Sequence, residues 1–304
     1  MGTPGFAVPS LDALHRSRHE ITLVVTQPDR PKGRGRKLTA PPVKTAARKF
    51  GYEVIQPESV KTDAFARTVL DLNPDIIVVI AFGHIIPKAV LATAREGAIN
   101  LHASLLPKYR GPAPIQWAII NGEAESGVTT MFMDEGMDTG DILLSHSVAI
   151  GSRDTSGTLH DTLAETGAEL VLETLDRMAA GTLSPLPQDD RRATYAPMLK
   201  KKDGRIDWNL PAKKIESLIR GVNPWPGAHT FCDDQRLKIH LARQLDAQTD
   251  AEPGTVLVGF PGELRIATGR GTLLLEEIQG ASGKCLLIKD FLCGCHIKPG
   301  SKLT

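Results

Sequence analysis

The strongest constraint on the fold is the unbroken apolar run Ile76–Ile80. A strand that is apolar on both faces is typical of a parallel sheet covered by helices, so this run is predicted to be central or near-central in such a sheet. Around it, the first two-thirds of the chain alternates short β-branched runs with helical patterns, as crossover units do. The expected strands are Ile21–Thr26, Tyr52–Gln56, Asp75–Ala81, Ala98–Leu101 and Val128–Met133.

Helical spacing of apolar residues accompanies these strands. The expected helices are Val8–Arg16, Val43–Phe50, Asp63–Leu72, Ile115–Asn121 and Thr158–Ala180. The segment Gly2-Thr3-Pro4-Gly5 is typical of a turn from a strand into a helix, yet no strand precedes it. We therefore predict an α/β fold with a Rossmann-like, doubly wound, mostly parallel sheet that lacks its first strand.

The last third of the chain has a different pattern. Basic residues dominate Met198–Asp207, which we interpret as an exposed linker, and the helix Ala212–Arg220 follows it. Closely spaced short strands punctuated by glycine then predict a small β-barrel. These strands are Ala228–Cys232, Leu237–Arg243, Gly254–Val258, Glu263–Ala267 and Thr272–Ile278. Since 304 residues suffice for two domains, we expect one domain at residues 1–197, a basic linker at 198–208 and a second domain at 209–304.

Composition excludes several classes of protein. Hydrophobic residues make up 41% and charged residues 23%, which excludes a disordered chain. No apolar run reaches the ~18 residues of a membrane span and no signal peptide begins the chain, so a cytoplasmic protein without a membrane partner is expected. The four cysteines are interpreted as free thiols. Because Cys293-Gly294-Cys295-His296 has too few ligands at metal spacing, no metal is expected.

Three motifs carry candidate chemistry. Asn100 and His102 alternate to the same side at the end of a predicted strand, where open α/β sheets bind ligands, although a structural Asn–His pair has the same spacing. The glycine-bracketed turn Met133–Asp141 places acidic residues at another strand end, where a capping or solvated role is the alternative to catalysis. The third motif is the glycine- and arginine-rich loop Gln27–Lys37. It fails as a dinucleotide fingerprint because position 38 is leucine.

The positive charge of the chain is concentrated in two stretches of the sequence. A net charge of +1 argues against a protein that coats nucleic acid, but residues 30–49 carry eight basic residues and no acidic one. From Met198 onward, 16 Lys and Arg face 12 Asp and Glu. Local blocks of this kind are typical of polyanion contacts.

Together these stretches resemble the methionyl-tRNA formyltransferases over nearly the whole chain. The matching segments are Gly2-Thr3-Pro4, Gln27-Pro28-Asp29-Arg30-Pro31 with Gly33-Arg34-Gly35, Asn100-Leu101-His102-Ala103-Ser104-Leu105-Leu106-Pro107, Tyr109-Arg110-Gly111, Gly136-Met137-Asp138-Thr139-Gly140, Ile206-Asp207-Trp208 and Asn223-Pro224-Trp225-Pro226-Gly227. The Asn-x-His and Asp-Thr-Gly segments are shared with other 10-formyltetrahydrofolate-using transferases and hydrolases. The basic loop and the Asn-Pro-Trp-Pro segment point to the tRNA-acting branch.

The resemblance implies that the formyl group of 10-formyltetrahydrofolate moves to the α-amine of methionyl initiator tRNA, without a metal. Asn100 and His102 would stabilise the oxyanion, and Asp138 would orient and charge His102. The folate-contacting segment would be Leu105, Leu106, Pro107 and Lys108, with Phe82 and Gly83 at another strand end. A monomer with an OB-like second domain is expected.

The resemblance also implies where the tRNA binds, through phosphate contacts from Arg and Lys. The expected residues are Arg30, Lys32, Arg34, Arg36, Lys37, Lys200, Lys201 and Lys202. Three alternatives remain open at this point: transfer to a small amino sugar, hydrolysis of 10-formyltetrahydrofolate, and an inactive RNA-binding protein with the same fold.

Overall fold

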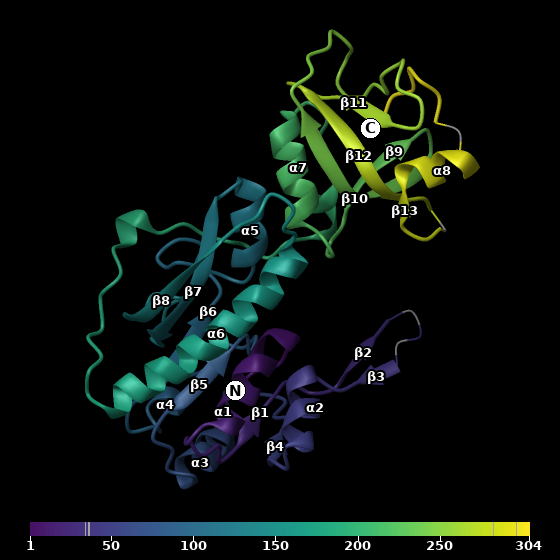
Figure 1. Cartoon of the computed structure of the whole chain (residues 1–304). Helices are drawn as coiled ribbons and strands as arrows, with labels where there is room; N and C mark the ends of the chain where they lie inside the picture. Colours follow the sequence, from purple (N-terminus) through teal and green to yellow (C-terminus); the bar gives the residue numbers. More distant parts are fainter. Residues whose placement is uncertain (34, 36, 282, 296) are drawn as a thin grey trace. The chain divides into compact units, whose positions relative to one another are not determined.

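Two compact units make up the chain in the computed structural model, which describes residues 1–33, 35, 37–281, 283–295 and 297–304 (Figure 1). Unit 1 comprises Met1–Pro114, Ser126–Ala149 and His160–Ala196. Unit 2 comprises Ile115–Glu125, Ile150–Leu159 and Pro197–Thr304. The predicted division into residues 1–197, 198–208 and 209–304 stays a prediction.

Unit 1 is built on strands that run in the order β5-β6-β7-β8. Strands β5 and β6 are parallel, β7 pairs antiparallel with β6, and β1 forms a separate parallel pair with β4. The strands are β1 (Val24–Val25), β4 (Val54–Ile55), β5 (Ile77–Ile80), β6 (Ala98–His102), β7 (Glu125–Phe132) and β8 (Ile142–Ala149). This confirms the predicted α/β class with a parallel-stranded core, while β8 was not predicted.

Helices pack beside these strands where their apolar stripes face the core. In α6 (Ser156–Ala179), Leu159 and Leu163 are fully buried, as the predicted stripe requires. Gly167 lets α6 approach the sheet, because a Cβ there would lie 2.6 Å from Leu101 Cδ2. The other helical elements of unit 1 are η1 (Gly5–Ala7), α1 (Val8–Arg16), α2 (Pro42–Lys49), α3 (Asp63–Asp71), α4 (Lys88–Leu91) and η2 (Asp190–Arg192), whereas α5 (Pro114–Asn121) belongs almost entirely to unit 2.

Unit 2 contains an antiparallel sheet in the order β11-β12-β10-β9, with β13 paired to β12. Register shifts around Leu241 bend β10, as β-bulges do, and curl the sheet. Helix α7 covers β10 with the buried side chains of Ile215 and Ile219. The bounds are η3 (Lys201–Gly204), α7 (Ala212–Gly221), β9 (Ala228–Cys232), β10 (Gln235–Leu245), β11 (Leu264–Ala267), β12 (Thr272–Gln279), β13 (Leu286–Leu287) and α8 (Ile288–Gly294). Closure into an OB-like barrel stays a prediction.

One predicted strand of unit 2 is reduced to isolated bridges. In place of a strand at Gly254–Val258, Thr255 bridges Lys302 and Val256 bridges Ile266. The carboxyl-terminal residues extend the edge of β9, where Thr304 and Phe231 exchange two backbone hydrogen bonds. Across the described ranges, no helix is both long and apolar enough to cross a membrane.

Met1 and Gly2 bridge β1 and β5 in place of a strand. The Met1 ammonium donates to the Val78 carbonyl at 2.6 Å, Ile80 N donates to Met1 O at 2.9 Å, and Gly2 N donates to Val25 O at 3.0 Å. A cavity of about 290 Å³ lies next to these bonds, between the residues that lead into β1 and those that lead into β5. Its apolar lining includes Leu11, Leu14, Ile21, Leu23, Ile76, Val78 and Leu175.

Two sequence predictions concern the strands beside this cavity. The run Ile76–Ile80, predicted to be central or near-central, forms β5. One edge of β5 pairs with β6, and the other bonds Met1 and Gly2, of which Gly2 in turn bonds Val25 of β1. The strand predicted at Ile21–Thr26 is limited to β1, because a ladder on one edge stabilises fewer residues than a ladder on both. Between β1 and β5 the described chain has only the backbone bonds of Met1 and Gly2.

Filling the cavity should stabilise unit 1. Burial lowers the pKa of the Met1 amino group to about 5 from its usual 8.0. Between these values the unfolded chain binds the additional proton, so stability rises with pH by at most about 1.4 kcal/mol per pH unit. We expect a five-residue Val- and Ile-rich extension fused before Met1 to raise the urea midpoint at pH 6 and to flatten this pH dependence.

A Gly-Ser extension of equal length is the matched control. It also replaces the ammonium by an amide but supplies no apolar side chains. Equal midpoints for the two extended chains would contradict the cavity-filling account.

Candidate active site

Strand β6 carries the two polar side chains that the sequence predicted to act together. Its register pairs Asn100 with Met131 and His102 with Thr129 on β7, and Asn100 with Val79 on β5. Side chains two residues apart on a strand share a face, so Asn100 and His102 lie on one side of the sheet. His102 is buried and Asn100 is half-buried. Within the described chain the Asn100 side chain has no hydrogen-bond partner, which leaves its amide free for a ligand.

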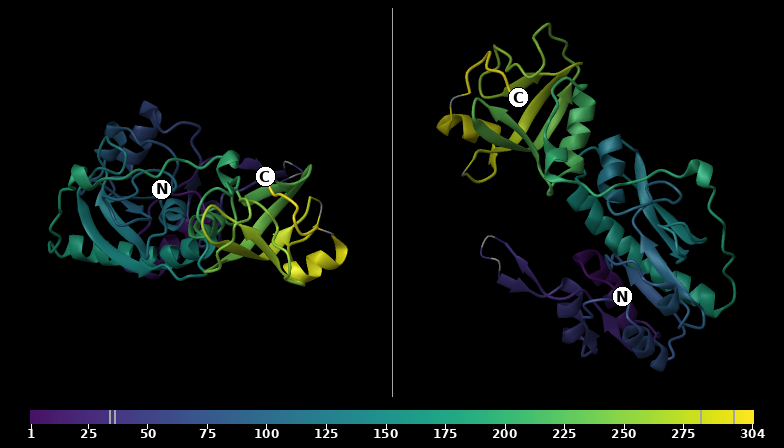
Figure 2. Two further views of the ribbon diagram at one scale, coloured as in Figure 1. Left: turned by 90° about the horizontal axis from the view of Figure 1, so that it is seen from above. Right: turned by 180° about the vertical axis from the view of Figure 1, so that it is seen from behind.

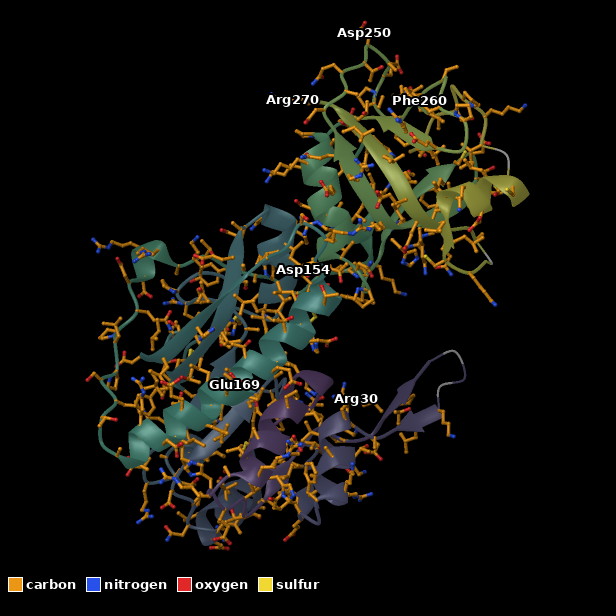
Figure 3. The ribbon with its side chains drawn as sticks, viewed as in Figure 1. Arg30, Asp154, Glu169, Asp250, Phe260 and Arg270 are labelled. Atoms are coloured by element: carbon orange, nitrogen blue, oxygen red, sulfur yellow. The ribbon has the colours of Figure 1, made fainter. Side chains whose placement is uncertain are left out.

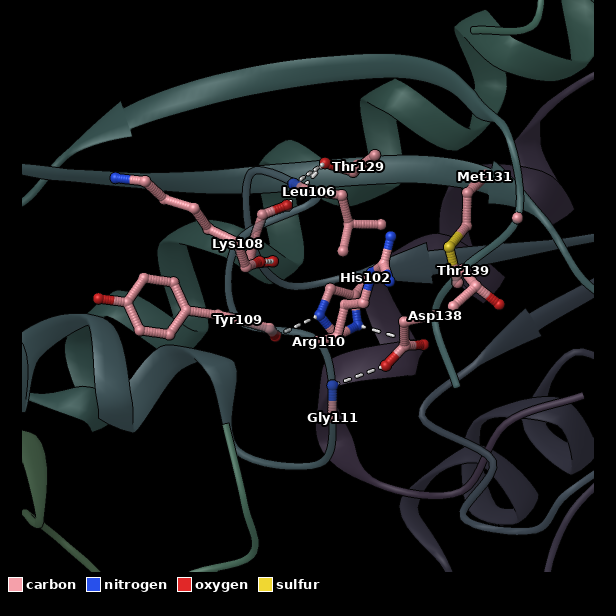
Figure 4. A network of polar contacts seen from close by, with 12 residues as sticks. His102, Leu106, Lys108, Tyr109, Arg110, Gly111, Thr129, Met131, Asp138 and Thr139 are labelled. Carbon is pink, nitrogen blue, oxygen red and sulfur yellow. Dashed lines mark hydrogen bonds and ion pairs between the residues drawn. The ribbon is translucent and has the colours of Figure 1, made fainter. Parts of the chain in front are cut away.

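Both ring nitrogens of His102 have defined surroundings (Figure 4). Nε2 lies 2.9 Å from the Tyr109 carbonyl oxygen, which can only accept, so Nε2 carries the hydrogen. Nδ1 lies 3.7 Å from Asp138 Oδ1, beyond hydrogen-bond range. Nδ1 is therefore the ring nitrogen that is not committed to the Tyr109 carbonyl, and it lies on the side of the Asp138 carboxylate.

Asp138 is the one acidic residue of the Met133–Asp141 turn that we find next to His102. Its Oδ2 accepts a hydrogen bond from Gly111 N at 2.8 Å, and its side chain is largely buried. Asp134 instead accepts from Gly136 N and from the Thr139 hydroxyl, which closes the turn.

Glu135 takes part in a different contact. It pairs with Lys88 at 3.0 Å, and both side chains are exposed. The capping role that the sequence left open therefore applies to Asp134 and not to Asp138.

The loop after β6 is held from two sides. On one side, Thr129 Oγ1 accepts from Leu106 N at 3.3 Å and donates to Ser104 O at 2.6 Å. On the other side, Thr194 Oγ1 accepts from Tyr109 N at 2.8 Å. The Tyr109 carbonyl that faces His102 is thus fixed by partners from distant parts of the sequence.

Backbone strain gathers at this loop and turn. Tyr109 has φ 61° and Asp138 has φ 56°, a left-handed conformation that side chains disfavour. Gly111 has φ 117°, and a Cβ there would lie 2.9 Å from the Ala196 carbonyl oxygen. Strained residues of this kind persist where surrounding contacts over-determine them, and functional sites are where they cluster.

The residues predicted to contact folate lie at two strand ends. Leu106 is buried, Leu105 is half-buried and Lys108 is exposed, all in the loop after β6. Phe82 follows β5 with its ring buried in the core, and its carbonyl accepts from the Thr3 hydroxyl and from Gln27 Nε2 at 2.9 Å.

Glycine is required at position 83, beside Phe82. Gly83 has φ 81°, and a Cβ there would lie 2.6 Å from Gln27 Nε2. Pro107 completes the predicted folate set, in the same loop as Leu106.

Part of the basic block forms a hairpin that extends away from the helices of unit 1 (Figures 1 and 2). Strands β2 (Arg30–Lys32) and β3 (Lys37–Thr39) pair antiparallel, with Arg30 opposite Thr39 and Lys32 opposite Lys37. Arg30, at the base of the hairpin in Figure 3, and Lys37 are exposed. Arg34 and Arg36 lie outside the described residues. In unit 2, the side chains of Lys200, Lys201 and Lys202 are exposed.

Lys44 belongs to the same basic block but has an internal role. Its ammonium donates to both carboxylate oxygens of Asp29, at 2.7 and 2.8 Å. The Lys44 hydrogen bond, followed by one from Gln56, lowers the pKa of Asp29. This ion pair anchors the residue that precedes the hairpin.

Metal binding finds no support in the part of the chain that the structure describes. No group of three or more His, Cys, Asp or Glu side chains there could hold an ion. The four cysteines are free thiols, and burial raises the pKa of Cys232 and of Cys285. His296, part of the weak metal motif, lies outside the described residues.

Sequence reasoning missed two residues of the site. Thr129 holds the loop after β6, but its role depends on the register of β7, which periodicity does not give. Gln188 bonds the Asp138 turn from a proline-containing segment that only showed a shift in composition. The segment Arg110-Gly111, which the sequence does single out, contains the glycine whose N–H bonds Asp138.

Comparisons with known proteins agree over the whole chain. The formyl transferase family model matches residues 1–175, and the model of the formyl transferase C-terminal domain matches residues 198–296. The methionyl-tRNA formyltransferase of Geobacter metallireducens is 48% identical over 304 residues, which cover 100% of this chain and 97% of that protein. That of Desulfotalea psychrophila is 51% identical over 297 residues, or 98% of this chain and 92% of that protein.

Solved structures share the fold at lower identity. An N-formyltransferase from Helicobacter canadensis, in complex with folinic acid and dTDP-3-aminofucose, has a TM-score of 0.66 and 19% identity over 92% of this chain and 97% of that chain. WlaRD, a sugar 3N-formyl transferase, has a TM-score of 0.67 and 18% identity over 93% of this chain and 97% of that chain.

Replacing Gly111 by alanine should distort the site and destabilise unit 1. The substitution forces a positive φ on alanine and drives Cβ against the Ala196 carbonyl, so we expect a loss of about 1–3 kcal/mol in the free energy of unfolding. Gly5→Ala is the control, because no atom lies within 4 Å of a Cβ built there. Chemical denaturation measures both, and a Gly111→Ala protein as stable as Gly5→Ala would refute the steric argument.

Proposed function

The chain belongs to the formyl transferase family, and from that membership we propose that it transfers the formyl group of 10-formyltetrahydrofolate to the α-amine of methionyl initiator tRNA. The product is N-formylmethionyl-tRNA, which serves translation initiation. The observation that carries the proposal is full-length identity of 48–51% to methionyl-tRNA formyltransferases. The side-chain pair His102 and Asp138, 3.7 Å apart, supplies acid–base chemistry suited to the reaction.

The reaction forms one C–N bond and breaks another. The amine nitrogen attacks the formyl carbon, and negative charge develops on the formyl oxygen, where positioned donors stabilise it most effectively. The free amide of Asn100 and the Nδ1 proton of charged His102 are suitable donors. Collapse of the intermediate breaks the bond to N10 of the folate.

Proton balance assigns a role to Asp138. The attacking amine loses a proton and N10 gains one. Asp138 Oδ1 is the carboxylate oxygen that faces His102, because Gly111 holds Oδ2. The pair can take the amine proton and return it to N10, while the Tyr109 carbonyl keeps the ring oriented.

We place the folate against the loop after β6 and the end of β5. Leu105, Leu106 and Pro107 offer an apolar surface for the flat pterin ring, and the exposed ammonium of Lys108 suits the carboxylates of the folate tail. Phe82 and Gly83 would meet the ring through their backbone, since the Phe82 ring is buried.

We place the tRNA on the basic hairpin and on η3. Arg30, Lys32, Arg34, Arg36 and Lys37 are assigned to the acceptor stem, and Lys200, Lys201 and Lys202 to the phosphate backbone. An OB-like closure of the unit 2 sheet would give a fold that commonly binds oligonucleotides. We further propose a monomeric, cytoplasmic enzyme.

The alternatives fit these observations less well. Sugar N-formyltransferases share the fold at 18–19% identity, far below the 48–51% of the tRNA-acting relatives. Hydrolysis of 10-formyltetrahydrofolate would not require the basic hairpin, because water is the acceptor and no phosphate backbone has to be bound. RNA binding alone would not require a buried His102 that faces a strained Asp138.

Asp138→Asn should remove catalysis while sparing folate binding. The amide still offers an oxygen to Gly111 N but no longer stabilises the His102 cation, so we expect kcat to fall roughly 10²- to 10⁴-fold. Steady-state formylation of methionyl-tRNA and fluorescence titration with a formyltetrahydrofolate analogue measure the two effects. A parallel loss of folate affinity would contradict the role given to Asp138.

Removing charge from the hairpin should weaken tRNA use alone. For Arg30→Ala/Lys37→Ala we expect the KM for tRNA to rise roughly tenfold at low salt and the salt slope of binding to fall by up to about 2, because two exposed cations no longer meet phosphates. Lys61→Ala/Arg67→Ala removes the same charge from exposed positions in and before α3. Equal tRNA kinetics for the two double variants would exclude the hairpin contact.

A further inference from the structure

The turn that contains Asp138 is held by a glutamine, Gln188, which lies outside both the segment around Asn100 and His102 and the Met133–Asp141 turn. Gln188 lies between α6 and η2, and its Nε2 donates to Asp138 O at 3.0 Å and to Gly140 O at 2.7 Å. Its Oε1 accepts from Arg110 Nε at 3.1 Å and from Nη2 at 2.8 Å. The partners are acceptor-only on one side and donor-only on the other, so the orientation of the amide is unambiguous.

Arg110 connects this glutamine to both members of the acid–base pair. Its side chain is 2% exposed, and its Nη2 also pairs with Asp190 Oδ1 at 2.8 Å. The residue before it provides the carbonyl that holds His102, and the residue after it provides the N–H that holds Asp138 (Figure 4). Gln188 therefore closes a ring of contacts that joins the loop after β6 to the Asp138 turn.

Gln188 bonds the backbone at the strained residue of the turn, Asp138. Asp138 has φ 56°, a conformation that persists only where its surroundings enforce it. Gln188 bonds the carbonyl of this residue directly. The Gly111 bond holds the carboxylate, so the two contacts together fix the backbone and the side chain of Asp138.

Anchoring of its own segment does not explain Gln188. Two residues earlier, Leu186 and Ile142 exchange two backbone hydrogen bonds at 2.8 and 2.9 Å. On the other side, Arg110 N donates to Thr194 O and Ala196 N donates to Arg110 O. The segment is attached to the unit on both sides of Gln188 without its side chain.

We propose that Gln188 is a positioning residue for formyl transfer, which holds the strained Asp138 turn so that the carboxylate faces His102 Nδ1. This inference rests on the proposed function for its kinetic readout. It assigns the segment between α6 and η2 a part in the chemistry.

The test uses two substitutions and one control. Gln188→Leu removes the hydrogen bonds to Arg110, Asp138 and Gly140, whereas Gln188→Glu keeps the partner of Arg110 and turns an oxygen toward the carbonyls of Asp138 and Gly140. Should the leucine variant fail to fold, the glutamate variant carries the test. Arg192→Ala is the control, because the Arg192 side chain is exposed and bonds none of Gln188, Arg110 and Asp138 among the described residues; Asp190, the η2 residue that pairs with Arg110, is left unchanged.

We expect kcat to fall about 10- to 100-fold in both Gln188 variants, with an unchanged KM for 10-formyltetrahydrofolate, because a misplaced catalytic group lowers turnover more than binding. In an Asp138→Asn background the same substitutions should have no further effect on kcat. A full additional loss there, or an unchanged kcat in the single variants, would overturn the proposal.

Amide hydrogen exchange gives a readout that is independent of catalysis. The Gly111 amide, which donates to Asp138, should exchange at least several-fold faster in the Gln188 variants than in Arg192→Ala. Equal exchange rates would also overturn the proposal. If the wild-type chain does not formylate methionyl-tRNA, the proposed function fails, and the exchange result still decides the role of Gln188.

Discussion

The hydrogen bond from the Gly111 amide to the Asp138 carboxylate joins the two parts of the site. It requires a glycine with φ 117° in the loop after β6 and an aspartate with φ 56° in the turn after β7. Glycine adopts positive φ without a steric penalty, but the aspartate conformation is strained, so the rest of the unit must enforce it. Thr129 and Thr194 hold the loop, and Gln188 holds the turn.

The arrangement also sets the chemistry of His102. With Nε2 committed to the Tyr109 carbonyl, proton exchange takes place at Nδ1, which faces Asp138 at 3.7 Å. The distance leaves Nδ1 free to meet a substrate. Burial excludes much of the competing water, so the charges act over this distance more strongly than they would at a surface.

Local patterns marked a strand end and an acidic turn as candidate sites, and the family resemblance assigned roles to His102 and Asp138 within them, but neither indicated the residues that support them. Strand alternation placed Asn100 and His102 on one side, and the glycine-bracketed turn offered several carboxylates, of which the resemblance singled out Asp138. Thr129 and Gln188 act across 23 and 50 residues of sequence. Their roles depend on strand register and on the path of an irregular segment, which periodicity does not determine.

The sheet shows the same limit. The apolar run at Ile76–Ile80 predicted a strand covered on both faces, and β5 confirms the strand. The apolar run did not show that the edge of β5 opposite β6 bonds only Met1 and Gly2 in the described chain, beside a cavity. Apolar composition reports how a strand is covered by helices. It does not report which edges of the strand are paired.

The most direct test of the account is a competition between acceptors. Purified protein is given 10-formyltetrahydrofolate with methionyl initiator tRNA and a nucleotide-linked amino sugar together, and mass spectrometry follows formyl-methionyl-tRNA, formylated sugar and free formate. The account predicts that formyl-methionyl-tRNA accumulates in step with loss of the donor. Accumulation of formylated sugar or of free formate instead would contradict it.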